Sequence, residues 1–118
     1  MSLKKEIERY SKLNGYYISS YEEINCSCGS NEFHLYSDDG EGGAYVICST
    51  CKTELDIESS REYMEDPQSN ICRCDNEDLN VGVGKAHYSE SNDPRWVYVG
   101  AHCNKCGLDG VYVDWKQN

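Results

Sequence analysis

Eight cysteines are the residues of this 118-residue chain whose type and spacing could do chemistry. They form four close pairs, alternately Cys-x-Cys and Cys-x-x-Cys: Cys26 and Cys28, Cys48 and Cys51, Cys72 and Cys74, and Cys103 and Cys106. Zinc takes four ligands at tetrahedral corners, and two close pairs brought together by a hairpin supply that geometry. The bound metal and nearby backbone N–H groups keep such thiols deprotonated. The pattern therefore predicts metal binding.

The residue after the second cysteine of each pair bears on the shape of the turn. Glycine at this position permits a positive φ angle without steric cost. Gly29 and Gly107 meet that requirement, whereas Lys52 and Asp75 do not. We therefore expect two of the four turns to be less ideal.

Three other uses of the cysteines remain open on the residues alone. A Cys-x-Cys disulfide would close a small strained ring and would need an oxidising compartment. A thioredoxin-like redox pair would start a helix after a strand, whereas both Cys-x-x-Cys pairs here end predicted strands. Iron or an iron–sulfur cluster could use the same ligands as zinc. We favour zinc and keep iron as the alternative metal.

Mostly strands are expected to position these cysteines. Residues 2–14 fit an amphipathic helix that Ser2 can cap and that Asn14-Gly15 ends. Ser20 and Glu23 resemble a capping box ahead of a brief helical turn. From Cys26 the apolar pattern has period two and predicts strands at 32–37, 44–48, 53–58, 78–89, 96–103 and 110–115. A helical turn is expected in the connector over residues 59–71.

An internal repeat organises the strands. Aligning Cys28 with Cys74 places Phe33 on Leu79, because each lies five residues after its cysteine. The second hairpin is the longer one, since 28 residues separate Cys74 from Cys103 whereas 19 separate Cys28 from Cys48.

Over residues 26–58 and 72–115 the sequence resembles the zinc-ribbon superfamily, which includes rubredoxin-like folds. The resemblance implies two Zn²⁺ sites, one of Cys26, Cys28, Cys48 and Cys51, the other of Cys72, Cys74, Cys103 and Cys106. Crossed pairing, in which the first and third pairs share a metal, is the alternative, and the repeat favours sequential pairing. Each unit departs from the family in having Cys-x-Cys where Cys-x-x-Cys is commoner.

The expected fold is a small, metal-stabilised, mostly β, α+β protein, with an N-terminal helix followed by two duplicated three-stranded zinc ribbons. The expected divisions are an N-terminal helix and linker at 1–25, ribbon one at 26–58, a connector at 59–71 and ribbon two at 72–118. Hydrophobic residues make up 38% of the chain, a share that counts eight Cys and ten Tyr. A core this thin needs help from metal to offset the entropy of folding.

The formal net charge of −10 narrows the choice of partner. Phosphate backbones repel such a surface, which makes nucleic acid unlikely, whereas a basic protein is attracted to it. Residues 1–66 hold 14 acidic and 6 basic residues, so most of the excess lies there. No membrane span or export signal is evident, and we expect a cytoplasmic location.

Catalysis is not expected from this residue set. Four cysteines leave a zinc ion no open coordination position. His34, His87 and His102 fall on predicted strands and match no catalytic motif. Asp38 and Glu41, with their acidic neighbour Asp39, are interpreted as a solvated turn.

Two functions follow as hypotheses. The first is an acidic protein–protein interaction module, in its concrete form an immunity or antitoxin-type inhibitor of a basic nuclease. Aromatic residues of the second unit would be its interface anchors or would fill the core: Trp96, Tyr98, Tyr112 and Trp115. The alternative is a zinc-ribbon protein that binds nucleic acid or the transcription machinery through a basic, aromatic face. The residues of that face would be Arg73, Lys85, Tyr88, Arg95, Trp96, Tyr98 and Lys105.

Overall fold

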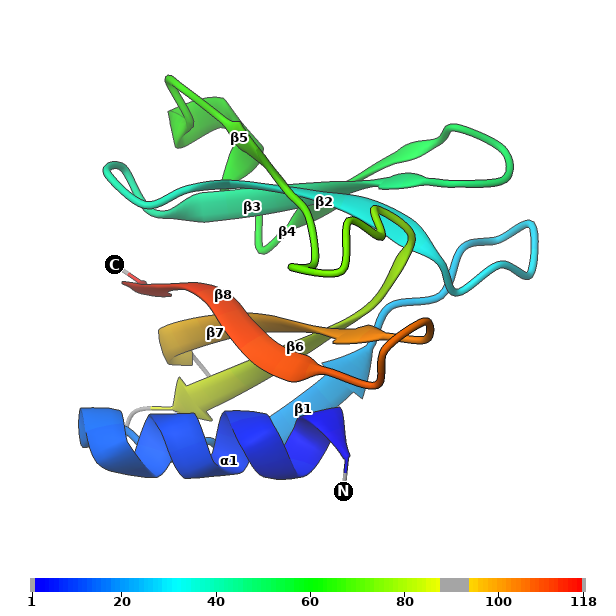
Figure 1. Cartoon of the computed structure of the whole chain (residues 1–118). Coiled ribbons are helices and arrows are strands. Elements are labelled where there is room, and N and C mark those ends of the chain that lie inside the picture. Colours follow the sequence, from blue (N-terminus) through cyan, green and yellow to red (C-terminus); the bar gives the residue numbers. More distant parts are fainter. Residues whose placement is uncertain (1, 88–93, 118) are drawn as a thin grey trace.

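A computed structural model describes residues 2–87 and 94–117 of the chain, and it contains one α-helix and an antiparallel sheet of eight strands (Figure 1). The elements in chain order are α1 (Leu3–Asn14), β1 (Ser20–Glu23), β2 (Phe33–Asp38), β3 (Gly43–Cys48), β4 (Glu54–Ile57), the 3₁₀ turn η1 (Arg61–Tyr63), β5 (Gln68–Asn70), β6 (Leu79–His87), β7 (Pro94–Cys103) and β8 (Asp109–Lys116). The expected fold class is therefore confirmed. Among the described residues, no helix is long and apolar enough to cross a membrane.

The helix α1 has the boundaries that its sequence predicts. The Ser2 hydroxyl accepts a hydrogen bond from the Lys5 N–H at 3.3 Å, and Gly15 ends the helix at φ 90°. Leu3 and Ile7 are buried, whereas Leu13 is 76% exposed. The buried face of the helix therefore consists of Leu3, Ile7 and Ser11, and Leu13 lies outside it.

Two three-stranded ribbons make up most of the sheet. Ribbon 1 has the order β4-β3-β2, ribbon 2 has the order β6-β7-β8, and β2 and β6 adjoin where Phe33 pairs with Leu79. The register is equivalent in the two ribbons, because Phe33 faces Cys48 and Leu79 faces Cys103. Both ribbons thus belong to one sheet, and the division into separate ribbon domains stays a prediction.

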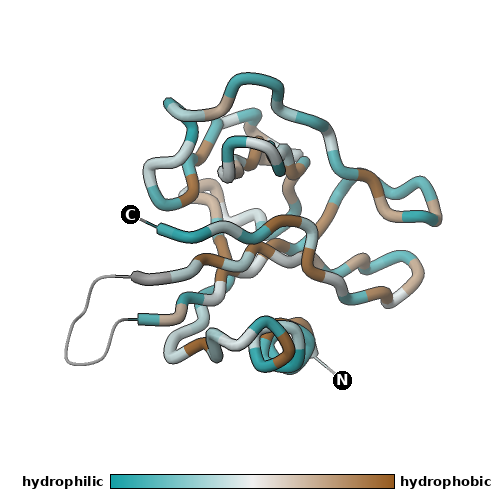
Figure 2. The backbone as a smooth tube through the Cα atoms, turned by 90° about the vertical axis from the view of Figure 1, so that its left-hand side faces the viewer, coloured by the Kyte–Doolittle hydropathy of each residue, from teal (hydrophilic) through white to brown (hydrophobic). Residues whose placement is uncertain are grey.

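The molecule has three layers, with α1 on one face of ribbon 2 and ribbon 1 across the other face (Figures 1 and 2). The main core lies between the ribbons and includes Leu35, Val46, Val81 and Val99, all at most 2% exposed. A smaller cluster joins α1 to ribbon 2. There Gly84 allows close approach, since a Cβ on it would lie 2.6 Å from the Ile7 Cγ2.

The strands β1 and β5 were not expected, and the predicted helical turn at Ser20 and Glu23 is wrong. This segment is β1 and pairs with Gly82–Lys85 of β6, which satisfies its backbone groups better than a local cap could. In the connector, η1 supplies the expected helical turn, and β5 then pairs with Leu35–Ser37 of β2. β1 precedes the Cys-x-Cys pair of the first unit but joins ribbon 2. β5 precedes the Cys-x-Cys pair of the second unit but joins ribbon 1.

Candidate metal centres

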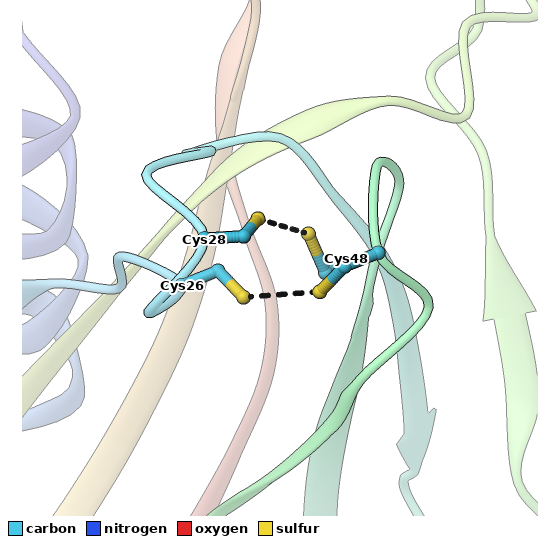
Figure 3. Close-up of side chains that lie close together, drawn as sticks. Cys26, Cys28 and Cys48 are labelled. Carbon is cyan, nitrogen blue, oxygen red and sulfur yellow. Dashed lines mark hydrogen bonds between the residues drawn. The ribbon is translucent and has the colours of Figure 1, made fainter.

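The first group of four cysteines lies between the β1–β2 connection and the β3–β4 turn. The sulfurs of Cys26 and Cys51 are 3.5 Å apart, those of Cys28 and Cys48 are 3.6 Å apart, and all four sulfurs lie within 4.8 Å of one another. Figure 3 shows the side chains of Cys26, Cys28 and Cys48 converging across the gap between the two turns. A tetrahedral metal bound by sulfur at about 2.3 Å has S–S edges of roughly 3.8 Å, so an ion fits with little adjustment.

The second group repeats this arrangement in ribbon 2. Its sulfurs are 3.4 Å apart for Cys72 and Cys106 and 3.5 Å apart for Cys74 and Cys103, and all four again lie within 4.8 Å of one another. The structure therefore brings together cysteines of the same unit, and it does not bring the first pair to the third. Each group could hold one metal ion.

The four turns that carry the cysteines form two matched kinds. In both Cys-x-Cys turns the N–H of the first cysteine donates to a carbonyl four residues on, namely Ser30 for Cys26 and Asn76 for Cys72, at 2.9 and 3.0 Å. In both Cys-x-x-Cys turns the N–H of the first cysteine donates to a carbonyl five residues on, at 2.9 Å. The local geometry of the two sites is thus the same although their sequences differ.

The residue after each second cysteine is left-handed in all four turns. Gly29 and Gly107 have φ of 94° and 83°, and Lys52 and Asp75 have φ of 67° and 71°. The same left-handed conformation is therefore present at Lys52 and Asp75, the two positions expected to make less ideal turns. These two residues adopt the same backbone at a conformational cost that glycine avoids.

Hydrogen bonds to sulfur prepare one cysteine of each site as a thiolate. The backbone N–H groups of Cys51 and Thr50 lower the pKa of Cys48 to about 6, against the effect of burial. The side-chain amide of Asn76, which lies 3.3 Å from the Cys103 sulfur, is the main cause that lowers the pKa of Cys103 to about 6. A thiolate binds metal without first losing a proton, so these contacts favour metal binding at neutral pH.

Burial differs between the cysteines of a site. The two that end strands, Cys48 and Cys103, are at most 1% exposed and belong to the main core, whereas Cys28, Cys51 and Cys106 are exposed. One side of each site is therefore anchored in the core, and the other is open to solvent for metal entry.

The three histidines lie on strands and outside both cysteine groups. The His34 Nε2 lies 3.0 Å from Asp78, the His102 Nδ1 lies 2.7 Å from Asp109, and the His87 ring contacts the Ser19 hydroxyl. Their hydrogen bonds join neighbouring strands and loops.

One residue of the acidic tip has a structural role that the sequence analysis missed. Asp38 is buried, and its carboxylate accepts hydrogen bonds from the backbone N–H groups of Gly40, Glu41, Glu65 and Asp66 at 2.9–3.1 Å. The N–H groups of Asp66 and of the other donors lower the pKa of Asp38. Asp38 thus ties the β2–β3 turn to the connector. A buried carboxylate between two turns has no distinctive sequence pattern.

The aromatic residues of ribbon 2 pack inward. Tyr98 is fully buried and its hydroxyl donates to the Tyr16 carbonyl at 2.8 Å, while Trp115 is 8% exposed. Trp96 stacks on Tyr16 with ring centroids 4.7 Å apart. These side chains therefore fill the core and do not form an exposed face. Tyr88 and the side chain of Arg95 lie outside what the structure describes.

Comparison with known proteins gives no relative to set beside these two centres: the chain matches no protein-family model, no curated protein and no solved structure.

Proposed function

We propose that this chain is a non-enzymatic zinc protein whose two four-cysteine centres are structural. The observation that carries the proposal is the convergence of four sulfurs within 4.8 Å in each of two groups. Four thiolates complete the coordination shell of zinc and leave no position for a substrate or a reactive water. Since Cys48 and Cys103 belong to the main core, metal binding and core formation would be one event.

Elemental analysis tests the metal assignment. We expect two zinc ions per chain, and one ion per chain when Cys28→Ser or Cys74→Ser removes a ligand from one site. A strong chelator should unfold the chain, as followed by circular dichroism, because the metal supplies much of the folding free energy. Iron in place of zinc, or a metal-free chain that is fully folded, would overturn the assignment.

The proposed role of the folded chain is to bind a basic protein through ribbon 1 and the connector. Residues 26–71 hold ten acidic and two basic residues, a net of −8 out of the −10 of the whole chain. A field of one sign on one part of the surface steers an oppositely charged partner toward it.

A pocket of about 420 Å³ lies between this acidic part and the end of β8. It is lined by three glutamates, two aromatic residues and one lysine among others, namely Glu41, Glu58, Glu62, Tyr63, Trp115 and Lys116. Tyr63 is 64% exposed, and a hydrogen bond to Glu62 raises its pKa. Glu58 already pairs with Lys85 at 2.8 Å, which leaves Glu41 and Glu62 to meet a lysine or arginine of a partner. Exposed tyrosine beside carboxylates is a combination that suits a basic interface.

Two of the residues proposed for the nucleic-acid alternative are not free for such contacts in the described part of the chain. Lys85 forms an ion pair with Glu58, and Tyr98 is fully buried. We therefore propose a protein partner, in its concrete form a basic nuclease toxin that this chain masks as an immunity or antitoxin protein would.

A charge-neutralised variant with a matched control tests this role. Glu41→Gln with Glu62→Gln should weaken the capture of basic proteins on the immobilised chain, and the loss should grow smaller at high salt. Glu22→Gln with Glu23→Gln, on exposed positions of β1, removes the same charge elsewhere and should leave capture nearly unchanged. Equal losses in both variants would refute the localised surface. A low-salt mobility shift with single-stranded RNA or DNA would support the alternative function.

A further inference from the structure

We propose that the two metal centres are thermodynamically coupled, so that filling one raises the affinity of the other. This inference rests on the proposed function, since it requires that both centres bind metal. Three sets of contacts between the two units carry it.

The first is a row of buried residues that runs across the sheet from one centre to the other. Cys48 of β3 faces Phe33 of β2, Phe33 faces Leu79 of β6, and Leu79 faces Cys103 of β7. All four are at most 1% exposed. With neighbouring strands about 4.8 Å apart, this row spans roughly 14 Å. A ligand of each ion is therefore two buried side chains away from a ligand of the other.

The second set holds the first Cys-x-Cys turn at both ends. Two residues before Cys26, the N–H of Ile24 donates to the carbonyl of Val81 in β6 at 2.9 Å. After the turn, Phe33 pairs with Leu79 of the same strand. The turn that carries two ligands of the first centre is thus fixed to β6, which belongs to ribbon 2.

The second Cys-x-Cys turn is held in the equivalent way by ribbon 1. Two residues before Cys72, Asn70 pairs with Leu35 of β2, and after the turn Leu79 pairs with Phe33 of β2. Asn70 lies 46 residues after Ile24, and Val81 lies 46 residues after Leu35. The two turns are therefore held at equivalent positions of β6 and β2. Each centre therefore depends on the order of a strand in the other ribbon.

The third set joins the Cys-x-x-Cys turns to the opposite unit through side chains. The Ser49 hydroxyl, next to Cys48, donates to the Asp78 carboxylate at 2.7 Å. The Asn104 amide, next to Cys103, donates to the Glu32 carboxylate at 3.3 Å. All four turns are thus in contact with the other unit.

Coupling follows from the ordering that these contacts require. The first ion to bind has to order its own turns together with the strand of the other ribbon that holds them. The second ion then finds that strand already in place, and less conformational entropy is lost when it binds. By linkage, the same factor must apply in both directions.

A zinc titration of the metal-free chain, followed by native mass spectrometry, tests the inference on the unaltered protein. Independent sites of equal affinity would leave about half of the chains with one ion at half saturation, and sites of unequal affinity would leave more. Coupling predicts clearly fewer chains with one ion. Because the two centres have the same turn geometry and therefore similar intrinsic affinity, half or more with one ion would refute coupling while leaving the proposed function intact, whereas no bound zinc would refute both.

Paired variants test reciprocity. Cys72→Ser with Cys106→Ser should weaken zinc binding at the first centre at least about tenfold relative to the second binding step of the unaltered chain. Cys26→Ser with Cys51→Ser should weaken the second centre by a similar factor. Ser27→Ala and Arg73→Ala are matched controls, because they change the middle residue of the same turns and remove no ligand. Unchanged affinity at the remaining centre would overturn the proposal, and a variant that fails to fold leaves the titration of the unaltered chain as the deciding measurement.

Discussion

The two Cys-x-Cys turns have the same backbone conformation at one position, but one turn has glycine there and the other has a non-glycine residue. Gly29 and Asp75 both follow the second cysteine, and both have left-handed φ, at 94° and 71°. We expect Gly29→Ala to weaken zinc binding and Asp75→Gly to strengthen it.

The magnitude follows from the backbone alone. A Cβ on Gly29 would meet no atom within 4 Å, so alanine there causes no clash and only the φ angle matters. The left-handed conformation costs an L-residue about 1–2 kcal/mol, and the greater freedom of glycine in the unfolded chain offsets roughly 0.5–1 kcal/mol of this. The net change in binding free energy is about 1 kcal/mol, unfavourable for Gly29→Ala and favourable for Asp75→Gly, which is roughly a fivefold change in affinity.

Competition for zinc against a chromophoric chelator measures these changes. The quantity compared between variants is the product of the binding constants for the first and the second zinc ion. Asp75 suits the test because it is exposed and its side chain makes no hydrogen bond or ion pair among the described residues. Lys52 is less suitable, since its ammonium donates to the Ser49 carbonyl at 2.8 Å and glycine would lose that bond too. If Asp75→Gly weakened binding as Gly29→Ala does, the side chain of Asp75 rather than its φ angle would govern the turn.

Three further outcomes are expected. Gly84→Ala should destabilise the metal-loaded chain by about 1–3 kcal/mol in denaturant unfolding, since its Cβ would lie 2.6 Å from Ile7. Gly110→Ala, whose Cβ meets nothing closer than 4.0 Å, should cost little, and equal losses would contradict the packing argument. Asp38→Asn should lower the melting temperature more than Asp39→Asn, because only Asp38 accepts the four backbone hydrogen bonds between two turns. Chelation should remove amide-exchange protection from α1 as well as from the ribbons, and a protected helix would show that it folds without the metal.

The sequence was informative wherever a regular pattern coincided with a structural requirement. The spacing of the cysteines and the alternation after Cys26 predicted both groups and all six strands of the two ribbons, because a half-buried strand needs an apolar residue at every second position. The helix had both a cap at Ser2 and an end at Gly15. These signals are local, and local patterns can be found without knowing the partner.

The strands β1 and β5 could not be found in this way. They are short and mostly polar, as in Gln68–Asn70, and their stability comes from pairing with strands far away in sequence. In β1, Ser20 and Glu23 even imitate a helix cap. Similarly, the left-handed backbone at Lys52 and Asp75 is imposed by the turn, so residue preference alone could not reveal it.

The strands that cross between the ribbons also bear on how such a chain could have arisen. Phe33 and Leu79 occupy equivalent positions in the two units and pair with each other, as residues on a two-fold axis do in a symmetric dimer. In each unit, the residues before the Cys-x-Cys turn add to the sheet of the other unit, which is the arrangement of a strand-exchanged homodimer. Apart from α1, which has no counterpart in the described residues, the two units are therefore arranged like two exchanged subunits, with η1 in the segment that joins them.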